Sequence, residues 1–158
     1  LSQHFGVDPR SVHAYIIGEH GDSEGPVWSL ANIAGMRFPV FCEQMGTGCD
    51  ANHLHRIFEQ TRDAAYHIIE RKGATYYAVA TGILRIVEAI LRDQGTVLSV
   101  SSHIDDYYGI NDVFFSLPTV IDRAGVERIL RLKLDDREVE GLRNSAQVLK
   151  DLARKIGF

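Results

Sequence analysis

Three consecutive segments between residues 95 and 134 are rich in β-branched and aromatic residues and are separated by short, turn-rich stretches. The segments are GTVLSVSSHI (95–104), DVFFSLPTVI (112–121) and VERILRLKL (126–134), and DDYYGIN and DRAG lie between them. This pattern is typical of strands joined by turns, and strands joined in this way run antiparallel. We therefore predict an antiparallel sheet in the C-terminal half of the chain.

Helical patterns flank these strands. Apolar residues repeat at intervals of three and four over residues 50–73, again from Thr75 onward, and again from Asp136. The segment from Thr75 is apolar nearly all round, which predicts a buried central helix, whereas the last segment predicts a surface helix packed by one face. A buried strand is predicted earlier, at residues 11–18 (SVHAYIIG). This order of elements indicates the α+β class rather than a doubly wound α/β sheet.

Length and composition limit the number of domains and the kinds of partner that we expect for this chain. The 158 residues, 45% of them hydrophobic, suffice for one core, and we expect residues 1–158 to form one domain. The net charge of −4 and the interspersed basic residues argue against a nucleic-acid surface. No apolar run approaches the roughly 20 residues of a membrane helix, and no signal peptide is visible, so we expect a cytoplasmic location.

Two smaller features of the N-terminal third complete this picture. Cys42 and Cys49 lack the spacing of zinc or redox motifs, and we expect both thiols to be reduced, with a disulfide between them as the alternative. The opening LSQHFGV (1–7) is more typical of the last turns of a helix than of the start of a protein, which favours a fragment of a longer chain.

The segment GEHGDSE (18–24) sets His20 between two glycines at the end of the first predicted strand. Glycines leave the backbone open to the close approach of a substrate, and histidine exchanges protons near neutral pH. His20 is therefore a candidate acid/base residue. The alternative is that the glycines serve a tight turn and that His20 faces solvent without a chemical role.

A metal site is a second alternative for this loop. Two sets of side chains offer ligands: His13, Glu19, His20 and Asp22 in one, and His53 and His55 in the other. Their spacing is poor, because the first set is spread over both ends of a strand and no helix carries two histidines one turn apart. We therefore expect no metal.

The stretch VHAYIIGEHGDSE (12–24), with PVWS (26–29) after it, resembles the catalytic stretch of bacterial L-lactate dehydrogenases. Three further stretches are similar to the same lactate/malate dehydrogenase family: AAYHIIERKGATYYAVATGILRIVEAIL, YGINDVFFSLPTVIDRAGV and LRNSAQVLKDLARKIGF. The resemblance covers essentially the whole chain and only the second half of that enzyme. It implies the family's C-terminal catalytic domain, with the NAD-binding Rossmann domain outside this chain.

The resemblance also implies roles for individual residues. His20 matches the acid/base that gives a proton to the carbonyl oxygen of pyruvate as hydride arrives, and takes it back when L-lactate is oxidised. Thr75 matches a substrate-binding threonine, and Val79 matches an aliphatic residue against the nicotinamide ring. A helix cap for Thr75 and a core position for Val79 are the alternatives. Trp28 and Tyr66 are assigned to packing near the site.

One further residue has an implied regulatory role. His13 matches a histidine at a subunit contact of a homotetramer, where fructose 1,6-bisphosphate binds. The family's arginine partner for that effector would fall just before Leu1. An exposed strand histidine without a ligand is the alternative.

Part of the machinery that the family uses is missing from this sequence. It has no glycine-rich turn in a βαβ unit, and the family's aspartate partner of the histidine and its carboxylate-binding arginine would lie upstream of Leu1. Asp22 is too close to His20 in sequence to replace that aspartate. We expect the chain alone to be inactive. A malate or other 2-hydroxy acid dehydrogenase, or a non-catalytic domain for assembly or effector binding, remain alternatives.

Overall fold

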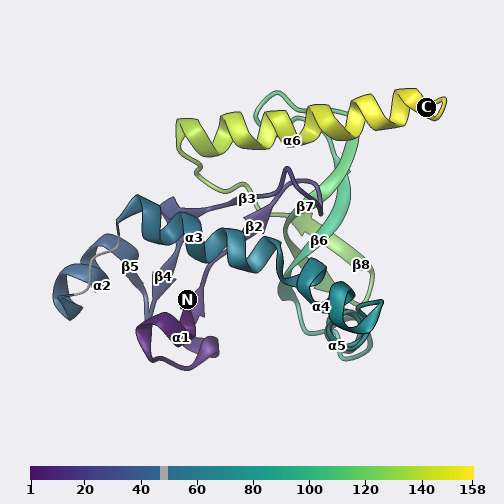
Figure 1. Ribbon diagram of the computed structural model, residues 1–158. Helices are drawn as coiled ribbons and strands as arrows, with labels where there is room; N and C mark the ends of the chain where they lie inside the picture. The colour runs from purple at the N-terminus through teal and green to yellow at the C-terminus, as the bar shows by residue number, and fades with distance from the viewer. Residues whose placement is uncertain (47–49) are drawn as a thin grey trace.

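The computed structural model describes residues 1–46 and 50–158 (Figure 1). Its strands are β1 (Val12–His13), β2 (Ile16–Ile17), β3 (Gly25–Pro26), β4 (Asn32–Ile33), β5 (Met36–Arg37), β6 (Thr96–Ile104), β7 (Val113–Asp122) and β8 (Gly125–Ile129). Its α-helices are α1 (Ser2–Phe5), α2 (Phe38–Met45), α3 (Ala51–Arg62), α4 (Ala64–Lys72), α5 (Tyr77–Leu91) and α6 (Asp136–Lys155). Short 3-10 helices at Pro9–Ser11 and Trp28–Leu30 precede β1 and β4.

The long sheet has the order β6-β7-β8, with antiparallel pairing throughout. The predicted antiparallel sheet and the α+β class are therefore confirmed. A second, three-stranded group has the order β1-β4-β5, and β2 pairs with β3. Within the described residues, no helix is both long and apolar enough to span a lipid bilayer.

The third strand of the long sheet is shorter than predicted, because tyrosine hydroxyls take over the backbone groups that follow it. The hydroxyl of Tyr107 donates to the carbonyl of Leu130 (3.1 Å) and accepts from the N–H of Leu132 (2.9 Å). The hydroxyl of Tyr108 likewise donates to Leu132 (2.8 Å) and accepts from Leu134 (3.1 Å). These bonds satisfy an extended segment that leads from β8 to α6 without a strand partner.

The stretch predicted as one strand at residues 11–18 forms two strands with different partners. β1 pairs with β4, whereas β2 pairs with β3. The backbone changes partner at Tyr15, whose carbonyl accepts a hydrogen bond from the N–H of Val27 (2.9 Å). Apolar patterning identified an extended segment here, but it carries no information about which segment pairs with it.

The helical pattern over residues 50–73 also forms two elements, α3 and α4, with Asp63 between them. The side chain of Asp50 caps α3 by accepting the N–H of His53 (2.7 Å). Gly73 ends α4 in the left-handed conformation (φ 80°), as its position after a basic pair predicts. The prediction that these residues are helical is confirmed. The prediction of one continuous helix is wrong.

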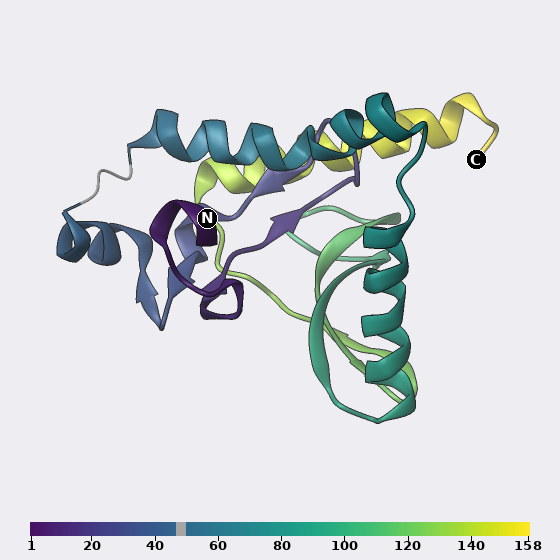
Figure 2. The ribbon, with the colours of Figure 1, turned by 60° about the horizontal axis from the view of Figure 1, so that its bottom comes forward.

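The prediction that the helix from Thr75 is buried on all sides is wrong for this chain. Helix α5 stands alongside the long sheet and packs on β7 (Figure 2). Ala89 is fully buried, but Val79 is 54% exposed, Ile83 56% and Leu91 75%. Periodicity measures how much apolar surface a helix presents and does not say whether the same chain supplies the residues that cover it.

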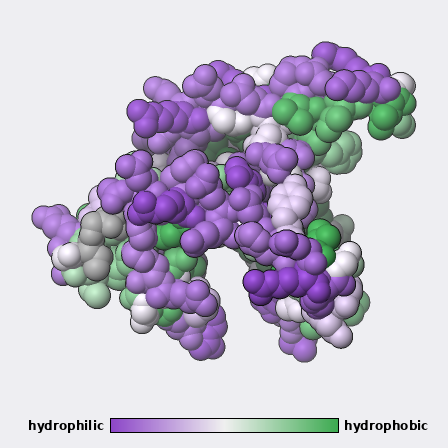
Figure 3. Space-filling view, in the orientation of Figure 1, coloured by the Kyte–Doolittle hydropathy of each residue, from purple (hydrophilic) through white to green (hydrophobic). Residues whose placement is uncertain are grey.

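Helix α6 is a surface helix, as predicted, and it begins with a capping box. The side chain of Asp135 accepts the N–H of Glu138, whose own side chain accepts the N–H of Asp135. Leu142 is buried against the core, but Leu152 is 49% exposed and Ile156 74%. Figure 3 shows apolar residues gathered below the C-terminal half of this helix, which extends past the sheet in Figure 1.

Two hydrophobic clusters lie in the interior. The larger cluster joins β2, β7 and α6 and includes Ile17, Phe115, Leu117 and Leu142. The smaller cluster joins α1, β4 and α2, where the ring of Phe5 meets those of Phe38 and Phe41 edge-on. The loop after β2 leaves from the larger cluster.

Cys42 does not carry the reduced thiol that its sequence context suggested. It is 6% exposed and disulfide-bonded. Cys49 lies outside the described residues. The expectation is wrong for Cys42, because motif spacing excludes metal and redox sites and says nothing about a structural cross-link.

Truncation of a buried leucine on α6 should destabilise the chain much more than truncation of an exposed one. Leu142 is 2% exposed and Leu152 49%. We expect Leu142→Ala to lower the free energy of unfolding by about 2–5 kcal/mol, because it leaves a cavity in the larger cluster. The matched change Leu152→Ala should stay within about 0.5 kcal/mol. Urea denaturation followed by circular dichroism measures both, and equal losses would contradict this account of the core.

Candidate active site

The loop that joins β2 to β3 is attached to the sheet at its first residue. Gly18 and Ser116 of β7 exchange two backbone hydrogen bonds of 2.9 Å each. Gly18 has φ +102°, and a Cβ atom there would lie 2.5 Å from the Oγ of Ser145 on α6. Glycine is therefore required at this position by its backbone conformation and by the close approach of α6.

Hydrogen bonds within the loop close it into a compact turn. The carboxylate of Glu19 accepts the hydroxyl of Ser23 (2.5 Å) and the N–H of the same residue (3.2 Å). The N–H of Gly21 donates to the carbonyl of Glu19 (3.0 Å), and the N–H of Glu24 donates to the carbonyl of Gly21 (3.2 Å). His20 therefore lies at the tip of a turn whose backbone is held on both sides.

The side chain of His20 is 97% exposed, which fits both the acid/base candidate and the solvent-facing alternative. Its Nδ1 lies 3.8 Å from a carboxylate oxygen of Glu24, whose side chain is only 12% exposed. Burial raises the pKa of the Glu24 carboxyl above its ordinary value of 4.5, and the neighbouring imidazole partly opposes this rise. The sequence places Glu24 among the acidic residues of this loop, and the structure shows that it is the one beside the imidazole.

His20 lies at a hollow of about 880 Å³ that several elements share. Besides the loop and β2, its walls come from α3, α4, α5 and the serine-rich face of β6 and β7: Thr61, Arg62, Ala65, Tyr66, Ile86, Ser99, Ser101 and Ser116. Arg62 is engaged by Asp63, with Nε 2.8 Å from the carboxylate. The hollow has the size of a small-molecule site, and its lining is mostly apolar with a few hydroxyl groups from serine, threonine and tyrosine.

Tyr66 has a different place from the packing role assigned to it from sequence. Its side chain is 57% exposed, and its hydroxyl donates to Asp22 in the His20 loop (3.0 Å). This bond to a carboxylate raises the pKa of the Tyr66 hydroxyl. The assignment is wrong because the tyrosine meets a loop from a distant part of the chain. The same bond engages one carboxylate oxygen of Asp22.

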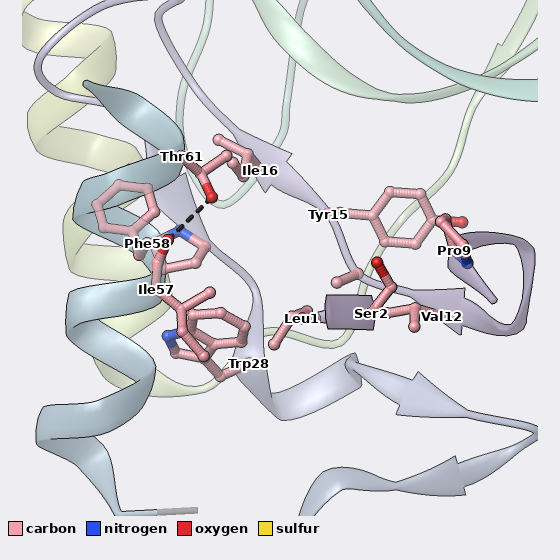
Figure 4. A pocket seen from close by; sticks show the side chains of 12 residues that line it. Leu1, Ser2, Pro9, Val12, Tyr15, Ile16, Trp28, Ile57, Phe58 and Thr61 are labelled. Atoms are coloured by element: carbon pink, nitrogen blue, oxygen red, sulfur yellow. Dashed lines mark hydrogen bonds between the residues drawn. The ribbon is translucent and has the colours of Figure 1, made fainter. Parts of the chain in front are cut away.

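Trp28 does pack, as predicted, and it borders a second, smaller pocket. Its ring stacks on Phe38 with centroids 6.0 Å apart. The pocket beside it has a volume of about 280 Å³ and is lined mainly by apolar side chains, among them Leu1, Ile16, Ile57 and Phe58 (Figure 4).

Thr75 precedes the cap of α5, and Val79 lies in the first turn of this helix. The cap of α5 is Tyr76 and no side chain caps the helix, so the capping alternative for Thr75 is wrong. The described walls of the hollow include neither Thr75 nor Val79. Helix α5 contributes Ile86, which lies about two turns beyond Val79 along the helix. The alternative that Val79 is a core residue of this chain is wrong, because its side chain is exposed.

The other histidines lie apart from this hollow. His13 is exposed on β1, opposite Asn32 of β4. His53 lies 3.2 Å from His4, and His55 lies 3.4 Å from Glu59. Residues 1–46 and 50–158 contain no group of three or more histidine, cysteine, aspartate or glutamate side chains that could hold a metal ion.

Comparison with known proteins places this geometry in a family. Residues 1–156 match the model of the lactate/malate dehydrogenase alpha/beta C-terminal domain. The chain is 49% identical over 156 residues to an L-lactate dehydrogenase of Thermoanaerobacterium saccharolyticum, covering 99% of the chain and 50% of that relative. It is 53% identical over 152 residues to an L-lactate dehydrogenase of Kosmotoga olearia, covering 95% and 47%.

Solved structures of lactate dehydrogenases have the same fold as this chain. A lactate dehydrogenase from a Medee basin deep-sea metagenome library superposes with a TM-score of 0.95 at 37% identity, over 99% of this chain and 50% of that one. The minor L-lactate dehydrogenase of Enterococcus mundtii, in a ligand-bound form, gives 0.92 at 37% identity, over 98% and 49%. The chain belongs to the lactate/malate dehydrogenase family, as its C-terminal domain. It spans about half the length of the relatives it matches.

The raised pKa of Glu24 has a consequence for stability. The folded chain binds the proton of Glu24 more tightly than the unfolded chain, so this group's contribution makes folding less favourable as pH rises from 4.5 through the raised pKa. We expect Glu24→Gln to remove this dependence, so that the melting temperature of the wild type falls relative to the variant between about pH 4 and pH 7. Thermal melts across this range test it.

The exposed glutamate Glu140 on α6 offers the matched control Glu140→Gln, which removes one solvent-exposed carboxylate. A wild type that gains stability over Glu24→Gln as pH rises would contradict the assignment of burial as the dominant influence on Glu24.

Proposed function

We propose that this chain is the substrate-binding and catalytic half of an L-lactate dehydrogenase, in which His20 exchanges a proton with the substrate oxygen. The observation that carries the proposal is the position of His20: an exposed imidazole, on a loop whose backbone is anchored to β7, at the edge of a hollow large enough for a small 2-oxo acid. The similarity to L-lactate dehydrogenases over nearly the whole chain supports it.

The reaction requires the transfer of one proton to or from the substrate oxygen. Reduction of a 2-oxo acid such as pyruvate places a hydride on the carbonyl carbon and a proton on the carbonyl oxygen, and oxidation of L-lactate reverses both. His20, when protonated, donates to that oxygen in one direction and, when neutral, accepts from the hydroxyl in the other. A bound nicotinamide cofactor supplies or accepts the hydride.

The residues of this chain suit one side of such a cofactor. The start of α5 presents an exposed apolar surface with Val79, which can form a dry wall against the flat face of a nicotinamide ring, and Thr75 offers a hydroxyl nearby in sequence for substrate binding. The sequence has no glycine-rich phosphate-binding turn. We therefore assign NAD binding mainly to an N-terminal nucleotide-binding domain that partners this one.

The same proposal covers assembly and regulation. A homotetramer with fructose 1,6-bisphosphate bound at His13 agrees with the exposure of this histidine on β1. We also propose that the protein is cytoplasmic and that residues 1–158 form a single domain. Because the matching family also contains malate dehydrogenases, a malate or other 2-hydroxy acid dehydrogenase is the second candidate. Competition between pyruvate and oxaloacetate in the full-length protein separates the two.

Removal of the His20 imidazole should abolish turnover in the full-length protein that carries this chain. We expect His20→Asn to lower kcat/KM for pyruvate about 10²–10⁴-fold, because general acid/base catalysis contributes roughly that factor. NADH oxidation followed by absorbance measures it. His55→Asn, an exposed histidine on α3, is the control and should retain wild-type rates. Near-normal turnover by a folded His20→Asn protein would refute the proposed role.

The isolated 158-residue chain should show no NADH-dependent reduction of pyruvate. The physical reason is that its sequence has no dinucleotide-binding turn and no residue that matches the family's aspartate partner of the histidine. A spectrophotometric assay at high enzyme concentration tests this. Robust turnover would show that the chain binds and uses the cofactor unaided.

A further inference from the structure

The geometry points to Ser145 of α6 as a positioning residue that holds the loop of His20 in the orientation needed for proton exchange. The inference rests on the proposed function, because it concerns the efficiency of the same histidine. Ser145 does not touch the hollow, lies 125 residues further along the chain than His20, and is 1% exposed. Its effect on the reaction is exerted through the backbone of the loop.

The hydroxyl of Ser145 on α6 contacts the loop on both sides of His20. It accepts the N–H of Glu19, the residue before His20, at 2.7 Å. The hydroxyl of Ser23, on the far side of His20, lies 3.2 Å from the same oxygen and also donates to the Glu19 carboxylate. One buried hydroxyl therefore ties the residues that flank His20 to a helix whose own position is set by the core.

This attachment matters because the imidazole has little else to hold it. The His20 side chain is 97% exposed, so packing does not fix its position, and its Glu24 neighbour lies at 3.8 Å. The direction in which the ring points depends chiefly on the backbone of Gly18, Glu19 and His20. Gly18 is held by β7 and Glu19 by Ser145, which leaves the loop without freedom to turn as a unit.

Helix α6 holds the same segment at a second place. The carboxylate of Glu138 accepts the N–H of Ser29 (2.9 Å) and its hydroxyl (2.6 Å), downstream of β3. Glu138 and Ser145 are seven residues apart, and two turns of an α-helix take 7.2 residues, so both side chains lie on one face. That face of α6 lies along the segment that carries the His20 loop and fixes it at both ends.

The test is Ser145→Ala in the full-length protein, because alanine removes the hydroxyl and keeps the volume nearly unchanged. We expect kcat for pyruvate reduction to fall about 10-fold or more with KM within about 2-fold, since a misplaced acid/base slows chemistry without weakening binding. The solvent deuterium isotope effect on kcat should rise, because proton transfer becomes slower. A residue that only stabilises the fold would not move these two readouts.

Amide hydrogen exchange reports on the attachment without any activity. Loss of its acceptor should speed exchange of the Glu19 amide on the order of 10-fold, while amides of β7 keep their protection. Asn144→Ala, an exposed neighbour on α6, is the matched control and should change neither kcat nor the exchange of Glu19. An inactive wild type would refute the proposed function, and the exchange of Glu19 would still report on the hydrogen bond.

A second variant covers the case in which Ser145→Ala does not fold. Ser23→Ala removes the hydroxyl on the loop side and leaves α6 intact, and we expect kcat to fall about 3-fold or more with KM unchanged. The inference is overturned if the variant that folds keeps wild-type kcat and an unchanged isotope effect while the exchange of Glu19 accelerates.

Discussion

The strand β7 is the element on which the rest of the molecule depends. It is hydrogen-bonded along both edges and buried over most of its length. One edge carries β6, and the other is divided between β8, which pairs from Thr119 onward, and Gly18, which pairs at Ser116. The sheet therefore extends directly into the loop of the candidate active site. A rigid central strand offers the fixed reference that a catalytic loop requires.

The candidate site combines a fixed backbone with a free side chain. Around His20, the backbone hydrogen bonds are made to β7, to α6 and within the loop, whereas the imidazole itself lies open to the hollow. This division suits proton exchange, because a ring that must meet an incoming oxygen cannot be buried in packing. Its orientation is then decided by residues that are far from it in sequence, such as Ser116 and Ser145.

Large apolar surfaces on α5 and on the end of α6 remain open in this chain. Val79, Ile83 and Leu91 on α5 and Ile156 and Phe158 after α6 are all more than half exposed. Exposed apolar area of this extent is unfavourable in water and marks surfaces that contact another part of a protein. The chain spans about half the length of its relatives, which is in keeping with surfaces that serve an interface rather than a core.

Local patterns in the sequence predicted the long strands and helices and singled out His20 as a candidate, although they missed α2, the break at Asp63 and the separate partners of β1 and β2. Alternation and turn residues predicted the antiparallel sheet, helical periodicity predicted α3 to α6, and two glycines around a histidine singled out His20. These properties depend on neighbours within a few residues, which a sequence displays directly. The family likeness added Thr75, Val79 and His13, whose roles remain proposals.

The tertiary structure alone decided which segments meet. The change of partner at Tyr15, the bond from Tyr66 to Asp22, the burial of Glu24 and the contact of Ser145 with the His20 loop each join residues whose relation no local pattern records. The same holds for the exposure of α5, because a hydrophobic face predicts burial without naming what covers it. Hydrogen bonds and burial depend on distances in space, and the sequence by itself specifies only distances along the chain.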